Sequence, residues 1–399
     1  MLQKSLLYEL DKYQLTNDFI TFFNNINIIF ENNRIESNEI ESNEIKNILI
    51  SQFCGLGDAI LSTCFVREVH NIYPQANIYL VIPKQYIEIY KNCEYVKVLP
   101  CNPQTNNMFS ILKDLIIFCT NNLPNIDIAF SPMWDPKISS LFLNWLSGAP
   151  VRVGYGKHTK AIYFKDLNYY LQTFGNEFNF DNYLLTDLII NPLQMYSEIE
   201  RKLYILESFC KVKIKNKSLS LYNDKVNINQ YLTNKKKIVV GLGGSTQNKK
   251  YSLHKWINIL KQFEKDYTIY LLDSKPIDIN IGINLTGQLT LNESIELIEN
   301  CDLYVGHDTS LVHIASAFNI PCVILYKEAI TKDKIIPGFL SFYHRYKPLT
   351  RCICLRPAKA KDECKEILIE GHCCSSKSHC INGIVEDKII KAIKNLLRK

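Results

Sequence analysis

The stretch VGHDTSLVHIASA (Val305–Ala317), followed directly by FNIPCVILY (Phe318–Tyr326), decides how this chain is interpreted. It predicts the end of a buried strand, a tight turn, a short helix beginning near Asp308 and a second apolar strand. A helix N-terminus at the carboxyl end of a parallel sheet presents unpaired N–H groups and a partial positive charge, which suits a phosphate-bearing ligand. Because Asp308, Thr309 and Ser310 are also ordinary capping residues, the stretch alone leaves a ligand site and a simple helix cap both open.

Composition bounds the class of protein. The chain has 399 residues, of which 47% are hydrophobic and 22% charged, as expected for two ordinary globular domains. The net charge of +6 is spread along the chain without a dense basic stripe, which argues against nucleic acid as a partner and suits a nucleotide or an anionic membrane face. The N-terminus lacks a secretory signal pattern, and no apolar run reaches the roughly 18 residues of a membrane span. We expect a cytoplasmic protein, with peripheral contact at the inner membrane face left open.

The first half of the chain alternates between strand and helix patterns after an N-terminal extension at residues 1–44. The predicted strands are Asn47–Phe53, Ile78–Ile82, Tyr95–Leu99, Ile126–Ser131 and Val151–Gly154. The predicted helices are Ala59–Tyr73, Gln85–Lys91, Ile111–Cys119, Ile138–Leu146, Asp181–Leu188 and Ile199–Cys210.

A second alternating set follows. Its predicted strands are Lys237–Leu242, Thr268–Leu272, Ile283–Leu285 and Leu303–Val305, and its predicted helices are Leu253–Phe263, Leu291–Glu299 and Val385–Leu397. Alternation of this kind predicts an α/β chain with two Rossmann-like, doubly wound parallel sheets facing across a cleft. We expect domains at 45–220 and 221–380, the second containing a cysteine-rich segment at 352–380, and a C-terminal helix in 381–399.

A glycine-rich turn, GLGDAILST (Gly55–Thr63), joins the first predicted strand to a helix. Gly57 permits close backbone approach, and Asp58 is either a helix cap or a carboxylate that takes a proton from a nucleophile. The turn is not GxGxxG, and the next strand ends in Pro83 and Lys84 where a ribose-binding acid is expected, so a dinucleotide site is disfavoured.

The corresponding turn of the second set is GGSTQNKKYSLHKW (Gly243–Trp256). Backbone amides near Gly244 and the Ser245 hydroxyl are suited to hold a phosphate that Lys249 neutralises, although a solvated lysine cluster is the alternative. The turn lacks the Gly-Lys-Ser/Thr ending of a nucleotide-hydrolysing loop. One strand later, Asp273 either contacts a ribose or forms a turn ahead of Ser-Lys-Pro.

Histidines and cysteines leave further alternatives. Thr309 and His313 lie one helical turn apart and present a hydroxyl and an imidazole on one face, but His313 and His307 also suit a purely structural role. Near the C-terminus a cluster contains Cys352, Cys354, Cys364, Cys373, Cys374 and Cys380 together with His372 and His379. It lacks paired CxxC motifs, so reduced thiols, disulfides and a bound metal all remain open.

In this order and spacing, the motifs resemble the heptosyltransferase family, glycosyltransferase family nine, from Asn47 to the C-terminus. The segments that carry the resemblance are Gly55–Ile82, Asp127–Tyr155, Lys249–Leu260 and Leu285–Tyr326. The resemblance implies a GT-B enzyme that binds a glycan or glycolipid acceptor on the first domain and a nucleotide-sugar on the second. It further implies inverting transfer of heptose from ADP-heptose to a lipopolysaccharide core or related surface glycan, without a metal or other cofactor.

The resemblance also implies roles by position. Asp58 would be the base on the acceptor hydroxyl, and Lys249 would neutralise the donor diphosphate. Gly57, Gly244 and Ser245 are predicted substrate-binding residues from their own motifs. The remaining implied donor contacts are Asp273, Asp308, Thr309, Ser310 and His313.

The chain departs from the family pattern at several positions. Ser310 stands where the family usually has glycine, and Tyr251 and Ser252 stand where tryptophan and proline are usual, which leaves the donor sugar open. The cysteines keep a protein O-heptosyltransferase with a metal-holding cluster as an alternative. A nucleotide-sugar epimerase of similar architecture is another, and a binding protein whose cysteine cluster is its functional part is a third.

Overall fold

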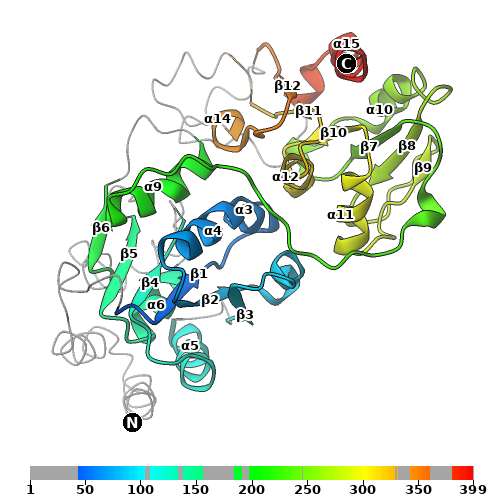
Figure 1. Ribbon diagram of the computed structural model, residues 1–399. Helices are drawn as coiled ribbons and strands as arrows, with labels where there is room; N and C mark the ends of the chain where they lie inside the picture. Colours follow the sequence, from blue (N-terminus) through cyan, green and yellow to red (C-terminus); the bar gives the residue numbers. More distant parts are fainter. Residues whose placement is uncertain are drawn as a thin grey trace. The chain divides into compact units, whose positions relative to one another are not determined.

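The computed structural model describes residues 44–103, 108–133, 138–155, 184–190, 197–244, 246–328, 330, 342–359 and 380–398 (Figure 1). Apart from Glu44, the predicted extension at 1–44 lies outside these residues. The chain divides into two compact units. The first extends to Lys217, and the second begins at Ser218 and also takes in Leu56–Leu61 and Glu198.

The first unit is built on a parallel sheet. Its described strands are β1 (Asn47–Ser51), β2 (Asn77–Ile82), β3 (Val96–Pro100), β4 (Ile128–Phe130), β5 (Val151–Tyr155) and β6 (Asp187–Ile189), in the order β3-β2-β1-β4-β5-β6. The central strands β1, β4 and β5 are almost wholly buried, as expected for parallel strands covered on both faces.

The described helices of the first unit lie between its strands in the chain, apart from the last one, which follows them. They are α4 (Thr63–Ile72), the 3₁₀ helix η2 (Lys84–Tyr90), α5 (Met108–Asn122), α6 (Ile138–Leu146) and α9 (Glu198–Cys210). Helices α5 and α6 pack together, and their core includes the fully buried side chains of Leu115, Phe142 and Trp145.

The second unit repeats the same topology. Its described strands are β7 (Lys237–Gly241), β8 (Thr268–Leu272), β9 (Ile283–Asn284), β10 (Leu303–His307), β11 (Cys322–Leu325) and β12 (Cys352–Leu355), in the order β12-β11-β10-β7-β8-β9. Numbered within each unit, both sheets have the doubly wound order 3-2-1-4-5-6. Strand order therefore reverses between β1 and β4 in the first sheet, and between β7 and β10 in the second.

The second unit also contains short helices. They are α3 (Leu56–Leu61), η4 (Asn229–Tyr231), η5 (Gln247–Lys249), α10 (Leu253–Leu260), α11 (Leu291–Glu299), α12 (Ser310–Ala317), α14 (Phe342–Tyr346), η7 (Ile381–Gly383) and α15 (Glu386–Leu397). Helix α11 begins with a capping box, in which Thr290 and Glu293 each accept a hydrogen bond from the other's backbone N–H. In the part of the chain described here, no helix is both long and apolar enough to cross a membrane.

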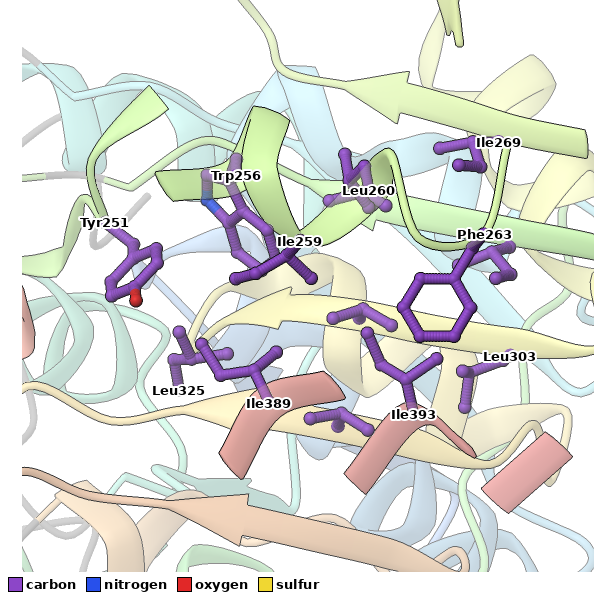
Figure 2. Close-up of a cluster of buried hydrophobic side chains, with 14 of the residues drawn as sticks. Tyr251, Trp256, Ile259, Leu260, Phe263, Ile269, Leu303, Leu325, Ile389 and Ile393 are labelled. Carbon is purple, nitrogen blue, oxygen red and sulfur yellow. The ribbon is translucent and has the colours of Figure 1, made fainter. Parts of the chain in front are cut away.

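Helix α15 closes the core of the second unit. Its apolar face contacts β10, β11, β12 and α10, and Figure 2 shows Ile389 and Ile393 among the side chains of Trp256, Ile259 and Leu325. Glu386 and Asp387 lie in its first turn and Lys394 in its last, the charge placement that a helix dipole favours.

The predicted fold class of two doubly wound parallel α/β sheets is confirmed. The bounds predicted for Ile138–Leu146, Thr268–Leu272 and Leu291–Glu299 are confirmed residue for residue. The helix predicted over Asp181–Leu188 is wrong in its described part, because Asp187–Ile189 pairs with β5 as the edge strand β6.

One further expectation is corrected, and one strand was missed. The single helix predicted over Ala59–Tyr73 is two helices, α3 and α4, with a break in the helix at Ser62. Strand β12 was not predicted, because Cys352–Leu355 is a four-residue edge strand with only half-buried side chains and gives a weak apolar pattern.

Replacement of Ile393 by alanine tests the packing of α15. Ile393 is fully buried, so Ile393→Ala leaves a cavity and is expected to lower the free energy of unfolding by about 2–5 kcal/mol in urea denaturation. The exposed neighbour Lys391 provides the control, since Lys391→Ala is expected to change stability by less than about 0.5 kcal/mol. Equal effects of the two variants would contradict the docked position of the helix.

Candidate functional site

The candidate site lies at the point where strand order reverses in the second sheet. Strands β7 and β10 are hydrogen-bonded neighbours there, with Gly241 opposite Gly306. The chain after β7 continues through Gly243 and Gly244, and β10 ends at His307, directly before Asp308. Ligands of doubly wound sheets bind outside the carboxyl ends of the strands at this reversal.

Helix α12 begins slightly later than the sequence predicts. Its first residue is Ser310, and Thr309 occupies the N-cap position with an extended backbone (φ −142°, ψ 176°). The Thr309 side chain makes no capping hydrogen bond, and Asp308 lies one residue before the cap. Asp308 is therefore not a helix cap, and its carboxylate has a different partner.

That partner is Lys249. Its ammonium lies 3.1 Å from the Asp308 carboxylate Oδ2 and donates a second hydrogen bond of 3.1 Å to the Asp308 backbone carbonyl. The two side chains are only 15% and 8% exposed, so Lys249 does not belong to a solvated lysine cluster. Burial works to lower the pKa of Lys249, but the charges of Asp308, Glu328 and Asp58 outweigh it and raise the pKa. Lys249 is therefore a buried cation that is paired with the Asp308 carboxylate.

The two glycines after β7 allow this close packing. A Cβ on Gly243 would lie 3.0 Å from the Asp273 carboxyl carbon, and one on Gly244 would lie 2.9 Å from Cβ of Lys249. A side chain at position 244 would displace Lys249, and one at position 243 would require the Asp273 carboxylate to shift. Ser245, which was predicted beside them, lies outside the described residues.

The carboxylate of Asp273 forms a turn. Its Oδ1 accepts hydrogen bonds from the Lys275 backbone N–H at 3.0 Å and from the Ser274 hydroxyl at 3.3 Å. This is the turn-forming role that the sequence left as the alternative. A ribose contact by Asp273 stays a prediction.

Helix α3 (Leu56–Leu61), which contains Gly57 and Asp58, lies against the start of α12. A Cβ on Gly57 would lie 3.3 Å from Cδ2 of His313 and 3.7 Å from Cα of Ser310, so α3 packs directly on the start of α12. Asp58 is the third residue of α3 and not its N-cap, which corrects the capping interpretation. Its negative charge contributes to the raised pKa of Lys249.

His313 is buried in this cluster. Burial lowers its pKa to about 4, Asp308 opposes that shift and Lys249 adds to it, so the imidazole is neutral at physiological pH. Its Nδ1 has no hydrogen-bond partner among the described residues. His313 therefore contributes a polar neutral group, and not a positive charge, beside Gly57 and Lys249.

Sequence reasoning did not single out Glu328. This carboxyl group follows β11 and is fully buried, and neither of its oxygens has a hydrogen-bond partner among the described residues. Burial raises the pKa of Glu328 to about 7, with Lys327 opposing and Asp308 adding to the shift. Its position in the sequence could have indicated it, because an acid just after an apolar strand of a parallel sheet lies at the ligand-binding edge.

Only part of the predicted cysteine cluster is described. Cys352 and Cys354 lie on β12 with their sulfur atoms 3.8 Å apart, and the hydrogen bond from Cys354 lowers the pKa of Cys352 to about 7. Cys380 is buried, whereas Cys364, Cys373, Cys374, His372 and His379 fall outside the described residues. The described residues contain no group of three or more His, Cys, Asp or Glu side chains placed to hold a metal ion.

Comparison with known proteins identifies the family. The family model described as glycosyltransferase family 9 (heptosyltransferase) matches residues 136–361, more than half of the chain. This chain belongs to glycosyltransferase family 9. The matched region contains the β7–β10 reversal, the Lys249–Asp308 pair and helix α12, whereas Gly57 and Asp58 on α3 lie outside it.

Solved structures agree with this membership at the level of fold. The family 9 chain superposes on the crystal structure of the glycosyl transferase family 9 from Veillonella parvula with a TM-score of 0.65 and 16% identity, covering 88% of this chain and 97% of that one. The structure of the Escherichia coli ADP-heptose lps heptosyltransferase II matches with a TM-score of 0.61 and 16% identity, over 89% and 99% of the two chains.

A curated relative matches over a shorter stretch. Lipooligosaccharide heptosyltransferase 2 of Haemophilus influenzae is 48% identical over 44 residues, which are 11% of this chain and 13% of that protein. The chain thus matches only a small part of the length of this relative, and activity and substrates are treated below as proposals.

Removal of the Lys249 ammonium tests the buried pair. Lys249→Met leaves the Asp308 carboxylate buried without its cation, and is expected to lower the free energy of unfolding by on the order of 3 kcal/mol in urea denaturation. Lys250→Met is the adjacent control and is expected to have little effect. The double variant Lys249→Met/Asp308→Asn is expected to lose less than the sum of the single variants. Additive losses would show that the two groups do not interact.

Acidification tests the buried histidines. The folded-state pKa of His313, about 4, lies below the ordinary value of 6.5, so the unfolded state binds more protons between these values. The stabilising effect of a neutral His313 is thus complete above about pH 6.5 and is lost as the pH falls towards 4, by on the order of 3 kcal/mol at most. In thermal unfolding from pH 7 to 4.5, His313→Gln is expected to show a shallower decline than wild type. The exposed His254, changed to glutamine, is the control, and an unchanged slope in His313→Gln would contradict the assignment.

Proposed function

We propose that this chain is an inverting glycosyltransferase that moves a heptose from ADP-heptose to a lipopolysaccharide core or a related surface glycan. The observation that carries the proposal is the Lys249–Asp308 pair beside the start of α12, at the reversal of the second sheet. A cation and a helix N-terminus together suit the diphosphate of a nucleotide-sugar. Family membership and the names of the E. coli and H. influenzae relatives support heptose as the sugar.

The chemistry requires two kinds of group. A hydroxyl oxygen of the acceptor forms a bond to the anomeric carbon of the heptose, while the bond from that carbon to the diphosphate oxygen breaks and ADP leaves with the bonding electron pair. The acceptor proton must be removed, and the negative charge on the leaving diphosphate must be stabilised. We assign Asp58 as the base, and we assign Lys249 and the first N–H groups of α12 to the diphosphate.

The pair with Asp308 prepares Lys249 for this role. An ammonium on a flexible side chain normally loses conformational freedom when it binds a ligand. Here Asp308 makes two contacts with Lys249 in the absence of a donor. Donor binding therefore costs less side-chain conformational entropy. A group fixed in advance at the place where charge develops contributes most to the reaction rate.

The other predicted contacts complete the proposal. Thr309, Ser310 and His313 are assigned to the donor sugar and phosphate, and Ser310 gives this chain a hydroxyl where the family pattern has glycine. The polar hydroxyl and the neutral imidazole are both able to bond sugar hydroxyls. A glycolipid acceptor would bring the chain to the cytoplasmic face of the membrane, and peripheral contact there is part of the proposal.

The proposed base is tested by Asp58→Asn, which keeps the shape of the side chain but cannot accept the proton as a carboxylate does. With ADP-heptose and a heptose-free core acceptor, the variant is expected to lose roughly 10²- to 10⁴-fold in kcat and to keep its affinity for ADP. Product is measured by mass spectrometry and ADP affinity by calorimetry. Asp266→Asn, at an exposed position, is the control and is expected to retain wild-type kcat. Near-normal transfer by Asp58→Asn would contradict the mechanism.

An incubation of wild type with donor alone separates the proposal from the epimerase alternative. A transferase is expected to leave ADP-heptose intact until an acceptor is added, because the attacking hydroxyl belongs to the acceptor. An epimerase converts the donor without an acceptor. A protein acceptor added in place of the glycan tests the O-heptosyltransferase alternative in the same assay.

A further inference from the structure

We propose that His307 is a positioning residue that fixes the Lys249 segment across the reversal of the second sheet, and so sets donor affinity. The inference deepens the function proposed above and rests on it. His307 is the last residue of β10, whereas Lys249 belongs to the segment that follows β7. The imidazole binds that segment at two points.

Both ring nitrogens of His307 make hydrogen bonds with backbone groups. Nδ1 lies 2.9 Å from the carbonyl oxygen of Gly243, and Nε2 lies 3.0 Å from the backbone nitrogen of Tyr251. A backbone N–H can only donate, so Nε2 is the unprotonated nitrogen and accepts from Tyr251. Nδ1 therefore carries the proton and donates to Gly243. The two contacts specify one neutral tautomer.

These two contacts hold the ends of one loop. Gly243 is at its beginning, Tyr251 is at its end, and Lys249 lies two residues before Tyr251. The Lys249 ammonium reaches back to Asp308, which is the residue after His307. The backbone contacts of His307 and the ion pair of its neighbour therefore act on the same segment. The two His307 contacts therefore constrain where the Lys249 backbone lies relative to Asp308.

The surroundings of His307 keep the imidazole in place. The side chain is fully buried, and its ring lies against Trp256 with centroids 5.8 Å apart and an interplanar angle of 61°. The charged groups that act on it come from different segments and have opposite signs: Lys249 and Lys250 lower its pKa and Asp273 raises it. Burial is the largest effect and lowers the pKa to about 4, so the neutral tautomer persists at physiological pH.

A purely structural histidine would behave differently from a positioning one. Loss of a structural hydrogen bond lowers stability and leaves the affinity of the folded protein for its ligand unchanged. Loss of a positioning contact lets the Lys249 loop adopt other conformations, so ADP must select the competent one and its apparent affinity falls. The KM for the donor should then rise while the KM for the acceptor stays the same. These readouts distinguish the two roles.

The test compares His307→Phe with Tyr251→Phe. His307→Phe keeps an aromatic ring beside Trp256 and removes both backbone contacts. Tyr251→Phe removes one buried hydrogen bond from the same loop, the 2.8 Å bond from its hydroxyl to the Ile384 carbonyl, but keeps the N–H that binds His307. His307→Asn is the second variant, since its shorter side chain is expected to retain at most one of the two contacts.

ADP affinity by calorimetry, donor and acceptor KM, and the thermal midpoint are measured for each protein. His307→Phe is expected to raise the Kd for ADP and the donor KM by about tenfold or more, with acceptor KM unchanged. His307→Asn is expected to raise both by a smaller factor, and it serves alone if His307→Phe does not fold. Tyr251→Phe is expected to lower the thermal midpoint and to bind ADP as wild type does.

Two results would overturn the inference. One is wild-type ADP affinity in a folded His307→Phe or, if that variant does not fold, in His307→Asn. The other is an equal loss of ADP affinity in Tyr251→Phe. Failure of the wild-type protein itself to bind ADP is a different result, and it would contradict the proposed function on which the inference rests.

Discussion

The buried ion pair between Lys249 and Asp308 is the interaction on which the candidate site depends. It joins the segment after β7 to the residue after β10, two places that are far apart in sequence and adjacent only because the strands are hydrogen-bonded neighbours. Removing two charges from water is costly, and the pair persists because Lys249 also bonds the Asp308 carbonyl. A buried pair of this kind is weak evidence for stability and better evidence for a site that needs a fixed cation.

The doubly wound order explains why these residues meet. In both sheets the chain starts in the middle, builds outward on one side and then crosses to the other, so the first and fourth strands become neighbours. In folds of this kind the loops after these two strands leave in opposite directions, and ligands bind between them at the carboxyl edge. In the second unit Gly243 and Gly244 follow the first of these strands, and Asp308 follows the fourth. Gly57 and His313 then pack against each other where α3 meets the first turns of α12.

Much of this could be predicted from sequence, because the signals are local. Continuous apolar runs predict the central strands, and the turn at Asp308 and the lysine-rich segment were recognised from short motifs. The misses have physical reasons. Strands β6 and β12 are short edges whose pairing, and not their composition, makes them strands. The ion pair of Lys249 with Asp308 was not predicted, because it joins residues that follow two different strands and no local motif specifies which side chains meet there.

Acidic groups, and not the histidines, dominate the charges that act on Lys249. The ammonium of Lys249 contacts the Asp308 carboxylate at 3.1 Å, and the charges of Asp308, Glu328 and Asp58 all raise its pKa. His307 and His313 add no positive charge near neutral pH, because burial lowers the pKa of each to about 4. Glu328 carries less negative charge than an ordinary carboxylate, because burial raises its pKa to about 7 and much of it is protonated near neutral pH. The negative charge of Asp308 adds to that shift.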